Sequence, residues 1–139
     1  MKRAGVFLIL FFAASQIFAQ ELAVEELRVE HKKNPVGVDD ANPRFSWRIA
    51  GSGFNIMQTA YSVRVATDPK FPASGSVWES GKVISGESIL QEYKGPELKS
   101  GQKYFWQVRV WDNRGKVSKW SETAFWETGL FSPSDWKAK

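Results

Sequence analysis

The stretch from Tyr104 to Trp111 constrains the fold of this chain more than any other. It reads Tyr-Phe-Trp-Gln-Val-Arg-Val-Trp, and such alternation with a period of two is typical of a β-strand with one buried face. The inward set of the predicted strand is Tyr104, Trp106, Val108 and Val110, and the outward set includes Gln107, Arg109 and Trp111. The pattern indicates a β-sandwich, in which a second sheet covers the inward face.

A corner motif precedes this strand and a turn follows it. Leu98, Gly101 and Tyr104 form a Leu-x-x-Gly-x-x-Tyr pattern. A tyrosine just inside a strand after such a corner can pin the crossing between two sheets through its hydroxyl. Asp112-Asn113-Arg114-Gly115 then turns the chain, and Trp120-Ser121 is predicted to open the next strand.

The first nineteen residues have the pattern of a secretory signal peptide. Met1-Lys2-Arg3 is a short basic head, residues 4–14 are almost wholly apolar, and Ile17-Phe18-Ala19 offers a small residue at a cleavage site. The alternative is a membrane anchor, but a span needs about 20 apolar residues and Ser15-Gln16 interrupts this run. We therefore expect a signal peptide over residues 1–19, a secreted or periplasmic location, and no membrane attachment after cleavage.

Length and composition limit the size and the expected partners of the mature chain. Removing 19 of the 139 residues leaves 120, enough for one domain with a single core. Lys2 and Arg3 are two of the 19 basic residues, so the mature chain has 17 against 15 acidic residues. No basic run stands out, so nucleic acid is not an expected partner. The chain has no cysteine, so aromatic residues must supply a core without disulfides. It has seven Trp, ten Phe and three Tyr, although several of the Phe lie within residues 1–19.

The mature chain is predicted to be all-β. Short alternating runs recur between clusters of Gly, Pro, Asn and Asp, and no segment has a convincing helical repeat. Inward positions include Phe45, Trp47 and Ile49 in one run and Tyr61, Val63 and Val65 in the next, where Ser62, Arg64 and Ala66 face outward. About seven strands result, at residues 22–30, 45–49, 61–66, near 77–78, 89–93, 104–111 and 123–128. We expect the sandwich to span residues 20–130 and a linker to a further domain to span 131–139.

The search for catalytic or metal-binding groups gives none. His31 is the only histidine and there is no cysteine, so neither a zinc or iron site nor a serine or cysteine nucleophile with its base is predicted. The carboxylates fall in predicted strands and turns, where solvated charges need no catalytic explanation. The sequence predicts no catalytic residue, no cofactor and no metal.

The tryptophans allow two interpretations. Trp47 and Trp106 lie on inward faces and are predicted to be core. Exposed tryptophans can form flat platforms for sugars, and the candidates are Trp78, Trp111, Trp120, Trp126 and Trp136. For Trp120 a structural role is favoured, because its position suits stacking on Arg109 or Arg64.

The corner residues, Gly115, Trp120-Ser121, Trp47 and Tyr61 together resemble a fibronectin type III domain. A narrower likeness covers nearly all of the mature chain. Several stretches are similar to the N-terminal sandwich of bacterial α-L-rhamnosidases of glycoside hydrolase family 78: residues 34–39, Asn42-Pro43-Arg44-Phe45-Ser46-Trp47, 77–83, 104–112, Trp120-Ser121-Glu122, Glu127-Thr128-Gly129-Leu130 and 135–139. The resemblance implies a fibronectin type III-like or immunoglobulin-like sandwich, and an (α/α)6 barrel elsewhere that carries the acidic catalytic residues. No catalytic position of that family has a counterpart here.

These observations lead to one expectation and two alternatives. We expect a non-catalytic accessory or scaffolding domain of an exported α-L-rhamnosidase-type glycoside hydrolase, present as a fragment or truncated product, with neighbouring domains as partners. The alternatives are a stand-alone carbohydrate-binding module for a polysaccharide and a protein-interaction domain of the cell envelope. Structural roles are predicted for Trp47, Tyr61, Leu98, Gly101, Tyr104, Trp106, Arg109 and Trp120. Interface or sugar contacts are predicted for Trp78, Trp111, Trp126, Phe131 and Trp136.

Overall fold

The computed structural model describes residues 4–6, 9–11, 21–132 and 134. Its seven strands are β1 (Ala23–Val29), β2 (Arg44–Ala50), β3 (Gln58–Ala66), β4 (Ser76–Glu79), β5 (Gln91–Glu92), β6 (Lys103–Asp112) and β7 (Ala124–Glu127). A single turn of 3-10 helix, η1 (Ala73–Gly75), precedes β4. Within the described ranges there is no α-helix, and hence no helix able to cross a membrane.

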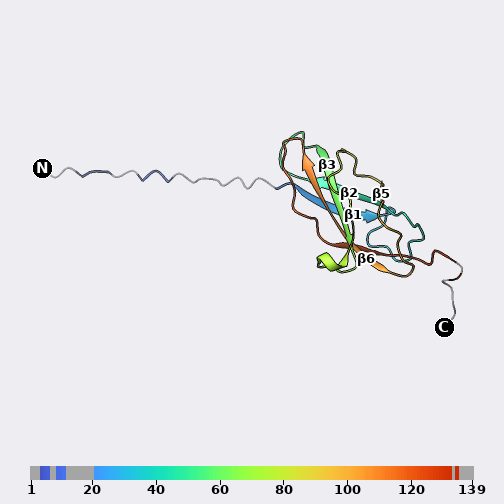
Figure 1. Ribbon diagram of the computed structural model, residues 1–139. Coiled ribbons are helices and arrows are strands. Elements are labelled where there is room, and N and C mark those ends of the chain that lie inside the picture. Colours follow the sequence, from blue (N-terminus) through green and yellow to red (C-terminus); the bar gives the residue numbers. More distant parts are fainter. Residues whose placement is uncertain (1–3, 7–8, 12–20, 133, 135–139) are drawn as a thin grey trace.

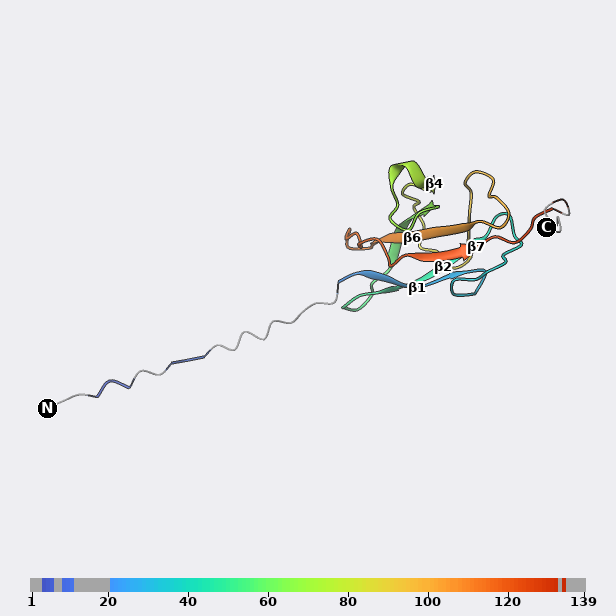
Figure 2. The ribbon, with the colours of Figure 1, turned by 90° about the horizontal axis from the view of Figure 1, so that it is seen from below.

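The strands form two antiparallel sheets that face each other (Figure 2). One has the order β1-β2-β5 and the other the order β4-β3-β6-β7. In Figure 2, β1 and β2 lie in one layer, and β4, β6 and β7 lie in the other. The predicted all-β, two-sheet sandwich of about seven strands is therefore confirmed.

The core lies between the sheets and is built around aromatic rings. Trp106 and Val108 in β6 are fully buried. Phe45 of β2 crosses the gap, with its ring centroid 4.6 Å from that of Trp106 and 5.5 Å from that of Trp126. Trp47 of β2 packs edge-on against Tyr61 of β3 at 4.9 Å. These contacts join the two sheets and place the predicted inward set of β6 in the core.

Two predicted strands differ from the observed ones. The run predicted at 89–93 forms a strand only at Gln91–Glu92, because Leu90 has a positive φ of 53° and its amide donates to the Ser46 hydroxyl rather than to a backbone carbonyl. Trp120-Ser121 does not open β7, which begins at Ala124.

Serine side chains explain the late start of β7. The Val110 amide donates to Ser118 Oγ at 3.0 Å, while the Ser118 amide donates to the Val110 carbonyl at 2.9 Å. Ser121 makes the same two bonds with Val108, at 3.0 and 2.9 Å. Because side-chain oxygens replace backbone carbonyls as acceptors, this segment follows β6 without forming a regular ladder, and Trp120 lies between its two anchoring serines.

A loop covers the free edge of β7. The Phe125 amide donates to Asn34 Oδ1 at 3.0 Å, and the Glu127 amide donates to the Pro35 carbonyl at 3.0 Å. The Val38 amide donates a hydrogen bond to the Glu127 carbonyl at 2.9 Å. An exposed strand edge invites pairing with another chain, so this loop protects the four-stranded sheet at β7.

The tyrosine corner has the expected geometry. Tyr104 is almost fully buried, and its hydroxyl accepts a hydrogen bond from the Lys99 amide at 2.8 Å. Its ring stacks on Trp126 at 5.2 Å. Leu98 is buried beside it, and Gly101 turns the corner with a φ of 62°, a conformation that favours glycine.

The corner predicts the effect of removing the Tyr104 hydroxyl. Tyr104→Phe should lower the free energy of unfolding by about 1–3 kcal/mol, because the part-buried bond between the Lys99 amide and the Tyr104 hydroxyl is lost. Tyr61→Phe is the matched control, since the Tyr61 hydroxyl makes only a long contact of 3.4 Å with Gln91 Oε1. Urea denaturation of the two variants and the wild type measures the difference. Equal losses in the two variants would contradict the corner role.

Candidate functional site

The outer face of the four-stranded sheet carries a column of alternating cations and aromatic rings. We call this column the ladder. Two of its members come from β6 and one from β3; the others come from the loop before η1, the segment after β4 and the segment after β6. In order along the column they are Phe71, Arg64, Trp120, Arg109, Trp111 and Lys82.

Successive members of the ladder are in van der Waals or cation–π range. The Arg64 guanidinium carbon lies 4.5 Å from the Phe71 ring centroid and 4.3 Å from that of Trp120. The Arg109 guanidinium carbon lies 4.6 Å from Trp120 and 5.3 Å from Trp111. Lys82 Nζ ends the column 4.9 Å from Trp111. The predicted stacking of Trp120 is confirmed, and it involves Arg64 and Arg109 together.

The ladder seals a face that the sequence predicts to be open. The alternation in β3 correctly turns Ser62 and Ala66 away from the core, but both are buried, with 5% and 1% of their surface exposed. The ladder side chains lie over this face of the sheet. Outward-facing residues at the centre of this sheet are therefore buried as well.

The two ladder arginines differ in their hydrogen bonding. Arg64 Nε donates to Gln107 Oε1 at 2.9 Å, and burial lowers the pKa of the Arg64 guanidinium. Arg109 has no hydrogen-bond acceptor and no ion-pair partner among the described residues, and its Nε is buried. The centre of the ladder therefore holds a full positive charge with unused donors.

The outer face of the three-stranded sheet is built differently. Arg48 pairs with Glu25 at 2.8 Å and with Glu26 at 3.1 Å. Arg44 pairs with Glu30 at 2.6 Å, and the hydrogen bond from Arg44 lowers the pKa of the Glu30 carboxyl. Carboxylates neutralise the arginines on this face, whereas rings contact them on the other.

A second ordered feature lies where the chain leaves the sandwich. The Thr128 amide donates to the Gln102 carbonyl at 2.9 Å, and the Gly129 amide donates to the Val38 carbonyl at 2.7 Å. The Phe131 amide donates to Ser100 Oγ at 3.1 Å. A Cβ on Gly129 would clash with Asp39 Oδ1. We call residues 128–131 with these contacts the exit clamp.

Of the residues predicted to make interface or sugar contacts, one lies in the core and three are half-buried. Trp126 is not on the surface, because its exposed fraction is 0%. The alternation in β7 turns Ala124 and Trp126 inward, and the Trp126 ring packs against both Phe45 and Tyr104. Trp78 is half-buried and packs edge-on against Tyr93 at 4.9 Å. Trp111 is half-buried in the ladder, Phe131 is half-buried against the core, and Trp136 lies outside the described residues.

These placements argue against a tryptophan platform. Trp78 packs toward the core and Trp126 lies inside it. Of the three predicted sugar-contact tryptophans that the structure describes, only Trp111 lies on an outer face, where Arg109 and Lys82 contact its ring.

Sequence reasoning missed the ladder ends and two buried polar residues. Phe71 and Lys82 lie in loops, where no periodicity signals a contact. Gln58 is buried, and its Oε1 accepts from Trp47 Nε1 at 2.9 Å. Asp112 is buried at the end of β6. Burial would raise the pKa of its carboxyl, but hydrogen bonds from the Arg114 side chain and from the Lys116 and Arg114 amides outweigh burial and lower it.

The search for a conventional site within the described ranges finds little. No group of three or more His, Cys, Asp and Glu residues could hold a metal there. An open groove of about 870 Å³ runs between β1 and the segment at 119–124, with both acidic and basic side chains along it. Its walls bring no catalytic set together.

The ladder predicts a specific cost for removing its central ring. Trp120→Ala should lower the free energy of unfolding by about 1–4 kcal/mol, since it deletes two cation–π contacts and leaves two guanidiniums facing each other. Phe125→Ala is the matched control, because the Phe125 ring makes a single cation–π contact, with Lys103 Nζ at 4.1 Å from its centroid. Salt should reduce the cost of Trp120→Ala more than that of Phe125→Ala, because it screens the repulsion. Equal costs in urea denaturation at low and high salt would contradict this account.

Comparison with known proteins agrees with this architecture. Residues 24–132 match the family model described as Rha78A-like, N-terminal immunoglobulin domain. An α-L-rhamnosidase of Streptomyces avermitilis is 47% identical over 118 residues, which are 85% of this chain and 12% of that protein. The chain thus spans about 12% of the length of the curated relatives it matches.

Solved structures show the same likeness. The crystal structure of the Streptomyces avermitilis α-L-rhamnosidase complexed with L-rhamnose matches with a TM-score of 0.81 and 46% identity, covering 86% of this chain and 12% of that one. The α-L-rhamnosidase structure from Dictyoglumus thermophilum matches with a TM-score of 0.78 and 40% identity, covering 84% and 13%. With the sandwich, the corner and the family match in agreement, this chain belongs to the family of Rha78A-like N-terminal immunoglobulin domains.

Proposed function

We propose that this chain acts as a non-catalytic accessory domain of a larger α-L-rhamnosidase-type glycoside hydrolase, and that it holds the next domain in a fixed direction. The observation that carries the proposal is the exit clamp, in which three amides of residues 128–131 are bonded to two separate loops of the sandwich. Its relatives are named as α-L-rhamnosidases, and this chain corresponds to a small part of each.

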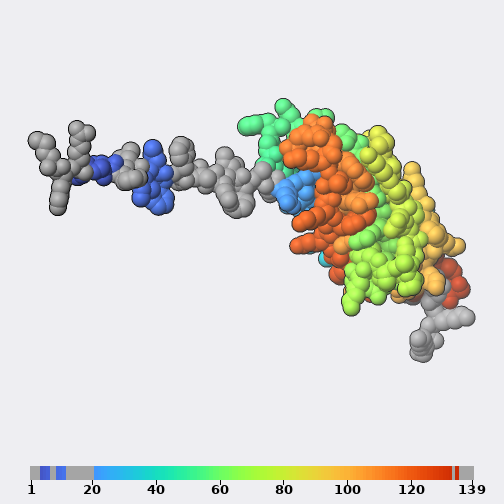
Figure 3. Space-filling model, turned by 60° about the vertical axis from the view of Figure 1, so that its left-hand side comes forward, coloured from blue at the N-terminus to red at the C-terminus, as the bar shows by residue number. Residues whose placement is uncertain are grey.

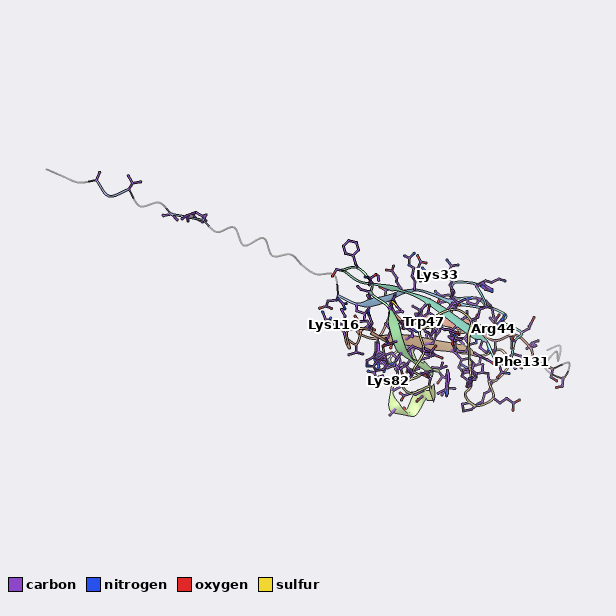
Figure 4. The ribbon with its side chains drawn as sticks, turned by 90° about the horizontal axis from the view of Figure 1, so that it is seen from above. Lys33, Arg44, Trp47, Lys82, Lys116 and Phe131 are labelled. Atoms are coloured by element: carbon purple, nitrogen blue, oxygen red, sulfur yellow. The ribbon has the colours of Figure 1, made fainter. Side chains whose placement is uncertain are left out.

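The arrangement of the chain ends suits a spacer. β1 begins at one end of the sandwich, and the segment after β7 leaves at the opposite end (Figure 1). Figure 4 shows Lys116 near the first of these ends and Phe131 at the other. A following domain would be separated from the start of β1 by the length of the sandwich.

The exit clamp would fix the direction in which the chain leaves the sandwich, and so the position of a following domain. Domain linkers are commonly exposed and make few contacts with either domain. Here Thr128 Oγ1 also accepts from the Gln102 amide at 2.9 Å, and Gly129 packs against the Asp39 side chain and the Gly37 carbonyl. Such bonding restricts the directions in which the chain can leave.

The titratable groups support a non-catalytic role. A glycosidase acid needs a carboxyl with a raised pKa near a second carboxylate. The pKa values of Glu30 and Asp112 are lowered instead, because Arg44 and Arg114 bond them. His31 is exposed in a two-residue turn.

We also propose that the protein is exported to the periplasm or secreted, as a portion of such an enzyme. The basic head and apolar run in residues 1–19 support this location. The absence of cysteine is compatible with it, because the aromatic core stabilises the sandwich without disulfides.

The proposal predicts that the purified chain does not hydrolyse rhamnosides. Turnover of an aryl α-L-rhamnoside should stay at the buffer rate at every pH tested, because no acid and nucleophile are assembled. The Streptomyces avermitilis α-L-rhamnosidase serves as the positive control for the assay. Turnover that a single Glu→Gln or Asp→Asn substitution in this chain abolishes would refute the proposal.

The exit clamp predicts a pattern of amide hydrogen exchange. The Thr128, Gly129 and Phe131 amides should exchange slowly, whereas the Leu130 amide, which has no acceptor among the described residues, should exchange fast. Thr128→Val should speed exchange at Gly129 and Phe131 and leave Val108 in β6 unchanged. If Gly129 exchanges as fast as Leu130 in the wild type, the exit is not rigid.

A further inference from the structure

We propose that the ladder face binds an anionic polysaccharide, with Arg109 and Lys82 contacting the carboxylate or sulfate groups of the polymer. This binding site goes beyond the accessory role and does not depend on it.

The first argument is the unused hydrogen-bonding capacity of Arg109. A guanidinium has five N–H donors in a planar fork that matches a carboxylate or a sulfate. Other arginines of the sandwich bond acceptors in the protein: Arg44 bonds Glu30, Arg48 bonds Glu25 and Arg114 bonds Asp112. Arg109 has no such acceptor among the described residues, yet two tryptophan rings hold it in place. Because its Nε is buried, the groups that this ordered guanidinium can present to an external anion are its two terminal Nη groups.

The second argument is the charge of the face. Lys82 and Lys103 are exposed, and both lie over rings rather than in ion pairs, at 4.9 Å from Trp111 and 4.1 Å from Phe125. Besides the buried Asp112, two carboxylates lie in the strands of this sheet, Glu79 opposite Arg64 and Glu127 opposite Lys103 in the strand register. Glu79 acts on Arg64 through its charge. Neither Glu79 nor Glu127 forms an ion pair with a cation of this face in the described part of the chain, so Arg109 and Lys82 have no carboxylate bonded to them there.

The third argument is the shape of the surface. In Figure 3 the orange segment after β6 lies against the green region of β3 and the loop before β4, and together they form one broad face. Figure 4 places Lys82 on the side of the four-stranded sheet and Lys33 on the side of the other sheet. The cations of the ladder follow one another in a row, separated by single rings. A row of charges matches the repeating anionic groups of a linear polymer.

The same features favour a polysaccharide over an acidic protein surface. Stable protein interfaces have an apolar centre in which aromatic side chains are buried by the partner. In the ladder the guanidiniums already cover faces of Trp120 and Trp111, so mainly ring edges remain for contact. Sugar C–H groups can pack against such edges while their anionic substituents bond the cations.

The experiment measures the binding of the full chain to four polymers. Polygalacturonate presents carboxylates, dextran sulfate presents sulfates, dextran is neutral, and poly-L-glutamate is an acidic polypeptide. Affinity electrophoresis and calorimetry at about 0.05 M and 0.5 M sodium chloride separate charge from other contributions. We expect binding to polygalacturonate, dextran sulfate or both, weaker at high salt, and none to dextran.

The variants locate the site. Arg109→Gln and Lys82→Gln should each weaken binding about tenfold, the loss expected for one charge-assisted hydrogen bond. Arg48→Gln is the matched control, because it removes the same charge from the other sheet and should change affinity less than about twofold. Lys82 is exposed at the end of the ladder, so Lys82→Gln keeps the test valid if Arg109→Gln fails to fold. Urea denaturation establishes which variants are folded.

Each other outcome overturns the inference. Absence of binding to both anionic polysaccharides refutes it. So do equal losses in Arg48→Gln and Lys82→Gln, which would mean diffuse attraction to the whole surface. Binding to poly-L-glutamate as tight as to the polysaccharides would assign the face to an acidic protein, and salt-independent binding to dextran would assign it to neutral sugars. None of these results bears on rhamnoside turnover or on the exit clamp, so the accessory role is judged separately.

Discussion

The packing of Phe45 against Trp106 and Trp126 is the contact on which the rest of the sandwich depends. Phe45 comes from the three-stranded sheet and the two tryptophans from the other, so this cluster joins the layers where no disulfide can. Each ring removes a large apolar area from water. The indole N–H groups of Trp106 and Trp126 are buried without acceptors, a cost that the packing of the rings must exceed.

Strand β6 connects this core to the surface chemistry. Its inward side chains form the centre of the core, and its outward side chains Gln107, Arg109 and Trp111 provide the partner of Arg64 and two members of the ladder. Because one strand carries both sets, the core fixes the spacing of the ladder. Ser118 and Ser121 then anchor the following segment to the backbone of β6, which holds Trp120 between the two arginines.

The sequence was informative where a residue's position follows from local periodicity. The inward set of β6, the tyrosine corner and the stacking of Trp120 could all be predicted, because each depends on alternation or on short spacing along the chain. Trp126 was predicted wrongly, although the alternation in β7 was visible, because the register of that strand relative to the core is set by its pairing with β6. Phe71 and Lys82 could not be found, since loops bring them to the ladder from positions without periodic neighbours.

The two outer faces show why the ladder is more than a way to cover a sheet. Ion pairs such as Arg48–Glu25 give exposed arginines a carboxylate within the protein itself. Cation–π stacking also covers the sheet and orders the side chains, but it engages the flat face of a guanidinium rather than its N–H donors. In the ladder the Arg64 donors reach Gln107 and the Arg109 Nε is buried, which leaves the terminal Nη groups of Arg109 without an acceptor among the described residues. A sheet that needed only to be covered would be served by either chemistry. The ligand contact proposed for the ladder face therefore depends on the terminal Nη groups of Arg109 and on Lys82, which rings hold in place without an ion pair.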